Sequence, residues 1–512
     1  MSYTPSKVVA LFLTEFDHHA GYIIRYQKST ISDFDFTGLD YKSMPSGVHE
    51  YNKSSILISH ISNNQRYYGL TKFAQYFVGE DTQDRNNIKI FSLSILCQPN
   101  PSIFKPNEFI NNGWEFINDL NFALVKYLQG QNYQDYTGFD KLFQELTTNR
   151  IKNTNLLSPG SGGGIPDVTN HPLTKLPQLF KTFGPLVFVL YKQSLLRKRI
   201  LIFNQHHIFH DDEDLLPNED HDLLLNLSTF CYLISLLSII PREVETSTNV
   251  VDFSQPIYSV GLNDLTGELF TKTDNYIGTT NDDILIENNK IYDFGVMIDE
   301  KVTSFQDNHN IKATNKDYHK FQLIYQDLPL NSKFNITNNR NLSTEDLNSI
   351  TSNTINNSKD FDPILRDNSE EPDWWKNEAT ESISWRESIW SAFSWFATAG
   401  QQLQDVHEDE HLTHLQDKID LFDLINIVGY FHKLTKKWFY LINEIVMEII
   451  QDEESHLTGK ITIELTYQDL VEMELDPYSQ QDIEFIKEFI LIYWNDMVDE
   501  VEIGIGLNSI CC

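Results

Sequence analysis

Two groups of histidines supply the residue types from which a metal site is built. In the first, His407 and His411 are four residues apart and Glu408 follows His407. On a helix this spacing places both imidazoles on one face, where they could bind zinc while Glu408 activates a zinc-bound water. The surrounding sequence, QLQDVHEDEHLTHLQD, is strongly acidic, has little apolar packing and specifies no third ligand, although His414 could supply one. We interpret the segment as a solvated acidic loop, with a zinc hydrolase as a remote alternative.

The second group comprises His206, His207 and His210, followed by Asp211 and Asp212. It comes directly after the strand-like run RILIF, where a loop is expected. Such a cluster could bind a metal adventitiously, but the pattern favours a polar surface loop without a ligand. The sequence therefore predicts no resident metal and no cofactor.

A glycine-rich stretch at residues 158–167 invites comparison with a phosphate-binding loop. Gly160 and Gly162 open it, but Pro159 precedes them and Ile165-Pro166 follows, with no Lys-Ser or Lys-Thr pair. A phosphate loop needs a strand before it and a helix after it. We interpret the stretch as a flexible connection between domains. No Gly-x-Ser-x-Gly elbow, kinase motif set or Cys-His pairing is apparent, so nucleophilic catalysis has no candidate residue.

The chain ends on two adjacent cysteines, Cys511 and Cys512. One lipid gives only reversible membrane attachment, whereas two give a stable anchor. A terminal Cys-Cys is the substrate form for double geranylgeranylation of Rab GTPases, but this chain has no GTPase motifs, and S-acylation is the other route. Cys511 and Cys512 are therefore candidate lipidation sites, the alternative being an unmodified tail. The other two cysteines, Cys97 and Cys231, form no disulfide framework, which favours a reducing compartment and a cytoplasmic location.

Five of the eight tryptophans lie close together in the last third of the chain. They are Trp374, Trp375, Trp385, Trp390 and Trp395. On a helix, Trp385 would share an apolar stripe with Ile389, Phe393 and Phe396. Trp390 and Trp395 would broaden this stripe, which favours docking against the rest of a helical domain. The alternative is insertion at a membrane or lipid-droplet surface.

The overall charge excludes one class of partner. The chain has 73 acidic and 39 basic residues among 512, a formal charge of -34. Such a surface repels phosphate backbones, so no nucleic-acid partner is expected. The uncharged run at residues 223–240 is short for a bilayer span, carries several polar residues and ends before Pro241. It is better explained as a helix buried in a globular core.

The elements that would position any site fall into three groups. Residues 7–97 alternate as strands of a small antiparallel sheet, and residues 107–128 have helical spacing. Residues 177–203 are typical of a helix running into a strand, and QPIYSVGLND, DDILIENN and IYDFGVMID resemble strands, which together suggests an α/β sandwich. The stretch at residues 326–373 is rich in Asn, Ser and Thr and too poor in apolar residues to order itself. After it, the spacing becomes helical.

Three segments together resemble the LCHN type of DENN-domain protein, including its fungal members. They are VVALFLTEFDHHAGYIIRY with GLDYKSMPSGVHE, then KTFGPLVFVLYKQSLLRKRILIF followed by YSVGLND, and the terminal GIGLNSICC. The resemblance implies an α/β plus α fold: a longin-like antiparallel sheet with helices, a central α/β DENN module and a helical C-terminal module. The expected longin-like module comprises residues 5–135, and the central DENN module comprises residues 170–325. A low-complexity linker at 326–375, the helical module at 376–506 and a tail at 507–512 follow.

The resemblance also implies a function in membrane trafficking. Members of this kind are usually guanine-nucleotide exchange factors for a Rab-type small GTPase, and they need no acid, base or nucleophile. Such a factor stabilises the nucleotide-free state of its partner, which is a population shift. The expected protein is a non-enzymatic regulator that is cytoplasmic or peripheral on endomembranes or lipid droplets. It would attach to such a membrane or droplet surface through the tail or the Trp-rich segment. The alternative is a lipid-anchored GTPase-binding adaptor without exchange activity.

Overall fold

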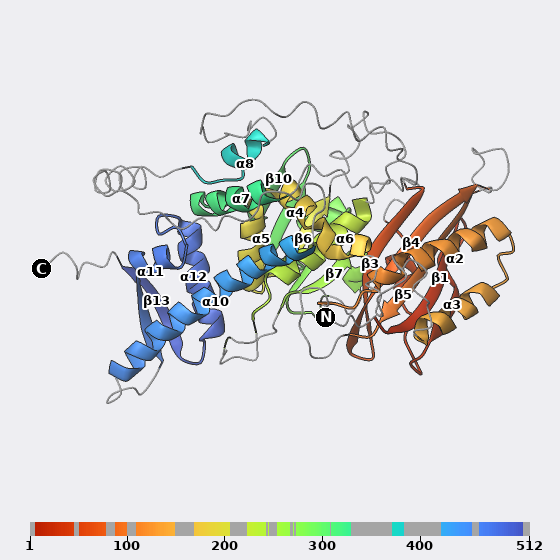
Figure 1. Cartoon of the computed structure of the whole chain (residues 1–512), viewed down its shortest axis with the longest axis horizontal. Helices are drawn as coiled ribbons and strands as arrows, with labels where there is room; N and C mark the ends of the chain where they lie inside the picture. The colour runs from red at the N-terminus through yellow and green to blue at the C-terminus, as the bar shows by residue number, and fades with distance from the viewer. Residues whose placement is uncertain are drawn as a thin grey trace, which may run out of the picture.

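A computed structural model describes most of the chain. The described residues are 6–45, 51–77, 88–99, 109–148, 168–204, 223–241, 244, 253–266, 270, 273–307, 309–328, 371–382, 421–452 and 460–504. They form an N-terminal, a central and a C-terminal module, arranged in that order along the long axis of the molecule (Figure 1).

The N-terminal module is a five-stranded antiparallel sheet in the order β2-β1-β5-β4-β3. Its strands are β1 (Val8–Asp17), β2 (Gly21–Ser29), β3 (Lys53–Ser62), β4 (Gln65–Phe77) and β5 (Ile88–Cys97). Side chains alternate between the faces of a strand, and both faces are buried here: Leu11 and Leu13 belong to one core cluster, Ala10 and Phe12 to another. The antiparallel sheet predicted from the sequence is confirmed.

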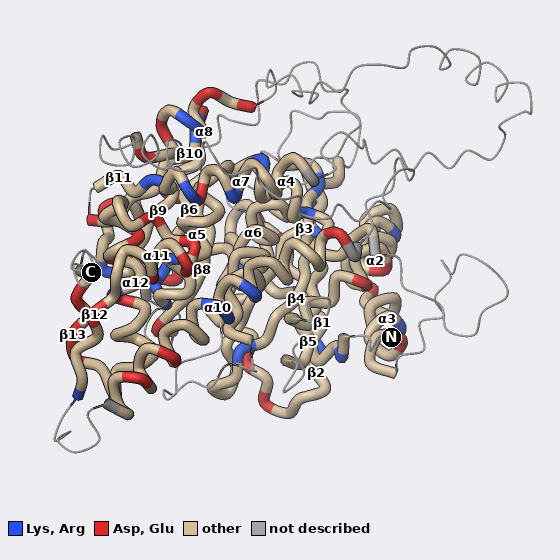
Figure 2. The backbone as a smooth tube through the Cα atoms, turned by 60° about the vertical axis from the view of Figure 1, so that its left-hand side comes forward, with Lys and Arg blue, Asp and Glu red and all other residues tan. Residues whose placement is uncertain are grey.

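Helices cover the two faces of this sheet differently. The short turn η3 (Trp114–Phe116) leads into α2 (Ile117–Gly130), which packs on β4 and β5, and α3 (Thr137–Thr147) packs on β1. The other face receives Phe34 and Leu39, the latter at the start of α1 (Leu39–Lys42). The strand β3 at the edge of the sheet also contacts helix α6 (Leu223–Leu237) of the central module (Figure 2).

The central module is a six-stranded mixed sheet in the order β11-β10-β9-β6-β8-β7. Its strands are β6 (Ile200–Asn204), β7 (Gln255–Ser259), β8 (Tyr276–Thr280), β9 (Phe294–Ile298), β10 (Val302–Gln306) and β11 (His309–Ile311). The first four pair in parallel, and β9, β10 and β11 are antiparallel. This is the predicted combination of sheet and helices, with helix α7 (Asn315–Asp327) completing the module.

Two local predictions for the central module need correction. Residues 177–203 run from helix into strand as predicted, but the helical part is divided into α4 (Leu176–Phe183) and α5 (Leu186–Leu195), because Gly184 has a positive φ of 54° and Pro185 follows it. The expected strand DDILIENN forms the 3-10 helix η8 (Asp283–Glu287), in which Leu285 is buried while its neighbour Ile284 is 70% exposed. In a half-buried strand every second side chain faces the core, whereas in η8 Leu285 is the buried residue, as a short helical turn allows.

The uncharged run predicted to be a buried helix is helix α6, whose described side chains are mostly buried in the main core. Its hydroxyl groups bond to backbone oxygens, as where Ser235 Oγ donates to Ser254 O at 2.5 Å. Within the described part of the chain, none of the helices is long and apolar enough to cross a membrane.

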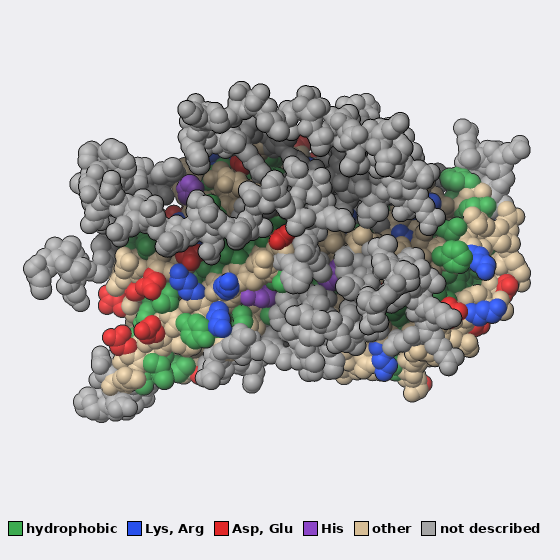
Figure 3. Space-filling model, in the orientation of Figure 1, with side chains coloured by type: hydrophobic (Ala, Val, Ile, Leu, Met, Phe, Trp, Pro, Cys, Tyr) green, Lys and Arg blue, Asp and Glu red, His purple; other side chains and the backbone are tan. Residues whose placement is uncertain are grey.

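The C-terminal module combines helices with a small sheet. Helices α10 (Leu421–Asp452), α11 (Tyr467–Glu472) and α12 (Gln480–Tyr493) are joined by the parallel strands β12 (Ile461–Thr466) and β13 (Val498–Gly504). The helical prediction is confirmed, but a strand at β13 was not expected. Acidic side chains gather over this module, beside basic side chains that lie over α10 (Figure 3).

One of the clustered tryptophans belongs to the central core. Trp375, in helix α8 (Asp373–Asn377), is 1% exposed and packs edge-to-face against Phe321 and Tyr325 of α7. A Cβ at Gly184 would lie 2.5 Å from Trp375 Cδ1, so only glycine fits there. Trp385, Trp390 and Trp395 lie outside the described residues, as do residues 329–370 of the expected linker.

Candidate functional site

The carboxyl ends of the parallel strands of the central sheet form one edge, where ligands and partners of open α/β sheets commonly bind. Two short helices begin there. The 3-10 helix η7 (Leu262–Thr266) follows β7, and η8 (Asp283–Glu287) follows β8. The fold therefore brings two turns from separate parts of the sequence to the same edge.

Asp282 joins these two turns. Its carboxylate accepts a hydrogen bond from the backbone N of Leu262 at 3.1 Å, and its backbone oxygen accepts from Leu285 N at 3.0 Å. The backbone N of Asp282 in turn donates to Thr280 Oγ1 at 3.0 Å. A single side chain thus fixes η7 relative to the start of η8.

A buried ion pair ties the same edge to the N-terminal module. Lys42 Nζ of α1 lies 3.0 Å from Asp264 Oδ1 of η7, and the two side chains are only 11% and 3% exposed. Asp264 Oδ2 accepts a further hydrogen bond from Gly261 N at 3.0 Å. Burial, and after it the charge of Asp264, raises the pKa of the neighbouring Tyr41 to about 12, so the phenol stays neutral. In the same way burial, and then Asp282, raises the pKa of Tyr22 in β2.

Apolar side chains are presented to solvent on these fixed turns. Leu262 and Leu265 of η7 are 42% and 39% exposed, and Ile284 of η8 is 70% exposed. Exposed Asp283 and Glu287 flank Ile284. We name these five residues the junction face. An exposed apolar group with an acidic rim is suited to holding a protein surface that is apolar at its centre and basic around it.

The candidate site residues singled out in the sequence are not among those that the structure describes. Cys511 and Cys512, the histidines around His407 and His206, and the glycines around Gly160 are all outside the described residues, so their interpretations stay predictions. Among the described residues, no group of three His, Cys, Asp or Glu side chains is arranged to hold a metal ion.

Sequence reasoning missed the junction face. Its signal was present in YSVGLND and NDDILIEN, where glycine, asparagine or aspartate comes shortly after a strand and is followed by an exposed apolar residue. Those segments were interpreted as strands, which would have hidden alternate side chains in a sheet instead of exposing them at an edge.

Two family models match the chain. The model for DENN domain-containing protein 11 matches residues 11–308, and a domain of unknown function, DUF4484, matches residues 414–511. The first match includes the whole junction face and most of both modules that meet beside it.

Individual relatives agree with the family match. The chain is 23% identical to the uncharacterized protein ANR2 of Saccharomyces cerevisiae, over 98% of this chain and 94% of that protein. It is 26% identical to DENN domain-containing protein 11 of Rattus norvegicus over 39% of this chain, and likewise 26% identical to that of Xenopus laevis over 38%. These matches span 41% and 43% of the two animal proteins, less than half of their length.

The family model for DENN domain-containing protein 11 covers more than half of the 512 residues, from within β1 to the end of the β10 strand region. The LCHN-type resemblance noted in the sequence points to the same family, and the antiparallel sheet, mixed sheet and helical region follow in the expected order. The chain therefore belongs to the DENN domain-containing protein 11 family.

Proposed function

We propose that this protein is a guanine-nucleotide exchange factor for a Rab-type small GTPase and that the GTPase binds at the junction face. The observation that carries the proposal is the extent of the family match, residues 11–308, which joins the N-terminal and central modules into one unit. DENN-domain proteins are generally regulators of Rab GTPases in membrane trafficking, and the junction face lies where these two modules meet.

The proposed mechanism needs no covalent chemistry. Leu262, Leu265 and Ile284 would contact apolar side chains of the GTPase switch regions, and Asp283 and Glu287 would face basic side chains beside them. The free energy of that contact is gained only when the switch regions move away from the nucleotide. The GTPase population therefore shifts toward its open state and GDP leaves.

The fixed geometry of the turns supports this mechanism. A binding surface loses less conformational entropy on association when it is already ordered. Asp282 holds η7 against η8, and the Lys42–Asp264 pair holds η7 against α1. The junction face is thus arranged before any partner arrives.

The test is release of a fluorescent GDP analogue from a panel of Rab GTPases, measured with and without the full-length chain. At least one GTPase should release its nucleotide at least about tenfold faster. A uniformly flat result across the panel would show that the exchange proposal is wrong. Binding to a nucleotide-free GTPase without faster release would instead favour the adaptor alternative.

Substitutions then locate the surface. Leu262→Asp and Ile284→Asp should each lower the accelerated rate by about tenfold or more, because a buried apolar contact of an interface centre is replaced by a charge. The matched control is Phe122→Asp on α2, a side chain that is 69% exposed and not part of the junction face. Equal losses in all three variants would rule out the junction face as the contact surface.

Membrane attachment through the tail is a separate proposal. Cys511 and Cys512 would carry lipids that place the protein where its membrane-bound GTPase resides. Replacing both by Ser should move the protein from the membrane fraction of cells to the cytosol. If fractionation of the double variant matches that of the unchanged protein, the tail is not an anchor.

A further inference from the structure

A cavity of about 280 Å³ lies between the N-terminal sheet and the helices of the central module. Its walls come from β3 and β4, from α2, from α6, and from two short turns, η4 (Val168–Asn170) and η5 (Pro172–Lys175). No residue of the junction face lines it. The cavity is therefore a second feature of the boundary between the two modules, independent of the proposed exchange activity.

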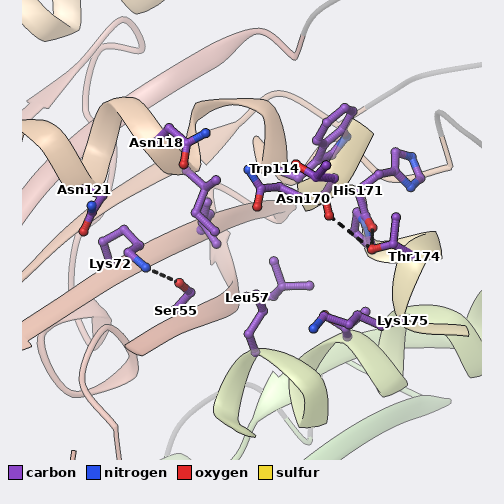
Figure 4. A pocket seen from close by; sticks show the side chains of 16 residues that line it. Ser55, Leu57, Lys72, Trp114, Asn118, Asn121, Asn170, His171, Thr174 and Lys175 are labelled. Carbon is purple, nitrogen blue, oxygen red and sulfur yellow. Dashed lines mark hydrogen bonds between the residues drawn. The ribbon is translucent and has the colours of Figure 1, made fainter. Parts of the chain in front are cut away.

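Two lysines give this cavity its charge. Lys72 of β4 and Lys175 of η5 approach the opening from different sides, with Leu57 between them (Figure 4). Lys72 Nζ donates a hydrogen bond to Ser55 Oγ at 2.6 Å, which holds the amine at the wall. Among the described residues that line the cavity, none is Asp or Glu. That composition stands out in a chain whose formal charge is -34.

Polar groups without charge surround the lysines. Asn118 and Asn121 of α2 and Asn170 of η4 line the cavity, and the two α2 side chains are exposed at its rim. An amide side chain offers both donors and an acceptor, so it suits hydroxyl groups as well as phosphate oxygens. The rim can therefore recognise a polar ligand body next to an anionic group.

The wall on the central side is held in place by hydrogen bonds. Buried His171 accepts a bond from Leu173 N at Nδ1 (3.0 Å), which leaves the proton of its neutral form on Nε2. Thr174 Oγ1 donates to His171 O at 2.7 Å, and Trp114 packs edge-to-face on the His171 ring. These contacts fix the turn that carries Lys175.

We propose that this cavity binds a small phosphorylated molecule, with a phosphate group between Lys72 and Lys175 and the polar body of the ligand against Asn118 and Asn121. A phosphate is a compact anion with several acceptor oxygens, and two ammonium groups can neutralise it from different sides. The apolar floor, formed by Leu57, Leu70 and Leu225, excludes water and strengthens the charge attraction.

The ligand would also affect how the two modules associate. Lys72 belongs to the N-terminal sheet and Lys175 to the central module, so a phosphate held between them would contact both modules. Any ligand that binds the folded chain and not the unfolded chain stabilises the folded state by mass action. The cavity is thus a site at which a phosphorylated molecule strengthens the boundary beside the junction face.

The experiment is isothermal titration calorimetry of the full-length chain with inorganic pyrophosphate and with inositol 1,4-bisphosphate as soluble probes. At least one probe should bind saturably. Lys72→Met and Lys175→Met should each weaken binding by about tenfold or more, and the double variant should abolish it. The two lysines lie on different elements, so a folding defect in one variant leaves the other informative. Thermal unfolding of each ligand-free variant identifies such a defect.

The matched control is Lys181→Met, which removes the same charge from an exposed position on α4 that does not line the cavity. It should leave affinity within about twofold of the unchanged protein. Equal affinity in the Lys72, Lys175 and Lys181 variants would overturn the proposal, because the bound probe would then lie elsewhere.

Vesicles separate the two sources of such a phosphate. Phosphatidylcholine vesicles with and without phosphatidylinositol 4-phosphate are sedimented with the chain. Retention only on the phosphoinositide vesicles, lost in the Lys72 and Lys175 variants, assigns the site to a lipid headgroup. Soluble binding without vesicle retention assigns it to a free metabolite. Absence of binding to the soluble probes and to both vesicle types would show that the proposal is wrong.

Discussion

The central module meets its two neighbours in chemically different ways. At the N-terminal boundary the charged group of Arg66 in β4 bonds to neutral acceptors: its Nε donates to Gln255 Oε1 at 2.8 Å, and a terminal nitrogen donates to Thr273 Oγ1. Further neutral bonds join β3 to the central module, as where Ser59 Oγ donates to Ile257 O at 3.0 Å. Burial lowers the pKa of Arg66, but a guanidinium stays protonated at physiological pH.

At the C-terminal boundary a lysine bonds to carboxylates instead. Lys192 Nζ of α5 lies 2.5 Å from Asp317 of α7 and 2.5 Å from Asp482 of α12, and all three side chains are nearly inaccessible. We name these three residues the buried triad. The two carboxylates share Lys192, and a second lysine, Lys320, places its Nζ 3.0 Å from Asp317 Oδ1. Burial would raise the pKa of Asp317, but Lys192 and Lys320 hold it below its ordinary value, whereas burial and Asp317 raise the pKa of Asp482.

The difference indicates that the stability of the C-terminal boundary depends more on paired buried charges than that of the N-terminal boundary. Losing one partner of a hydrogen bond to a neutral group leaves an unsatisfied polar group, whereas removing one ion of a buried pair leaves an uncompensated charge, which costs more. The C-terminal boundary should therefore respond strongly to a single charge substitution. The N-terminal boundary should lose less stability on a single substitution, except at the Lys42–Asp264 ion pair and at the buried His60.

The largest expected effect is at the buried triad. Lys192→Met should lower the free energy of unfolding by about 3–5 kcal/mol, because Asp482 remains buried without its cation and Asp317 keeps only Lys320. Urea denaturation followed by fluorescence measures the change. The triple variant Lys192→Met, Asp317→Asn, Asp482→Asn should recover part of the loss, since neither buried carboxylate remains. A triple variant as unstable as the single one would show that packing, not charge, closes this boundary.

The next effect appears as a pH dependence beside the N-terminal boundary. His60 in β3 is buried, and its burial lowers its pKa from 6.5 to about 4, with Lys42 and Arg66 acting in the same direction. The backbone oxygen of Asp35, 2.6 Å from Nε2, acts in the opposite direction. The unfolded chain binds the proton first, so stability is lost as pH falls from 6.5 to about 4, by roughly 3 kcal/mol in total.

The matched variant is His60→Gln, which keeps a side-chain donor for the Asp35 oxygen and removes the titration. Urea midpoints at pH 7, 5.5 and 4.5 should fall less for the variant than for the unchanged protein. Asp317 behaves differently, because its lowered pKa withdraws stability only as the pH falls below its ordinary value of 3.8. Parallel pH curves for the two proteins would mean that His60 is not the titrating group.

A smaller effect is expected at the ion pair that supports the junction face. Lys42→Met leaves Asp264 with its hydrogen bond from Gly261 but without its cation, so we expect a loss of about 1–3 kcal/mol. Because η7 would be less well fixed, exchange by the proposed mechanism should also slow. Thermal unfolding and the nucleotide-release assay measure the two changes. Slower exchange with unchanged stability would place Lys42 in direct contact with the partner.

The smallest effect is expected at an exposed pair. Lys28 Nζ lies 2.5 Å from Asp140 Oδ1, and the side chains are 38% and 47% exposed. Water screens such a pair, so Lys28→Met should change the free energy of unfolding by less than about 1 kcal/mol. This variant is also the matched lysine control for Lys192→Met. A loss as large as that at the buried triad would contradict the argument that burial sets the size of these effects.

Several elements were predictable because their signal is local. The alternation in residues 7–97 predicted the N-terminal strands, and the uncharged run at residues 223–240 predicted the buried helix α6. The quoted segments also carried the family resemblance. These features depend on the periodicity and composition of one segment, so they can be recognised without knowing which other segments it contacts. The candidate site was not predictable in this way, because the exposure of Leu262 and Ile284 depends on where the central sheet ends.

The sequence by itself determined the antiparallel and helical elements, the strongly acidic character and the family resemblance. Only the tertiary structure decided which distant residues meet: Lys192 with Asp482, which are 290 positions apart, and Lys72 with Lys175 around one cavity. It also decided that Trp375 packs against Gly184 in the central core. The physical reason is that burial and charge pairing depend on contacts between modules, and no periodicity within a segment specifies its partner in another module.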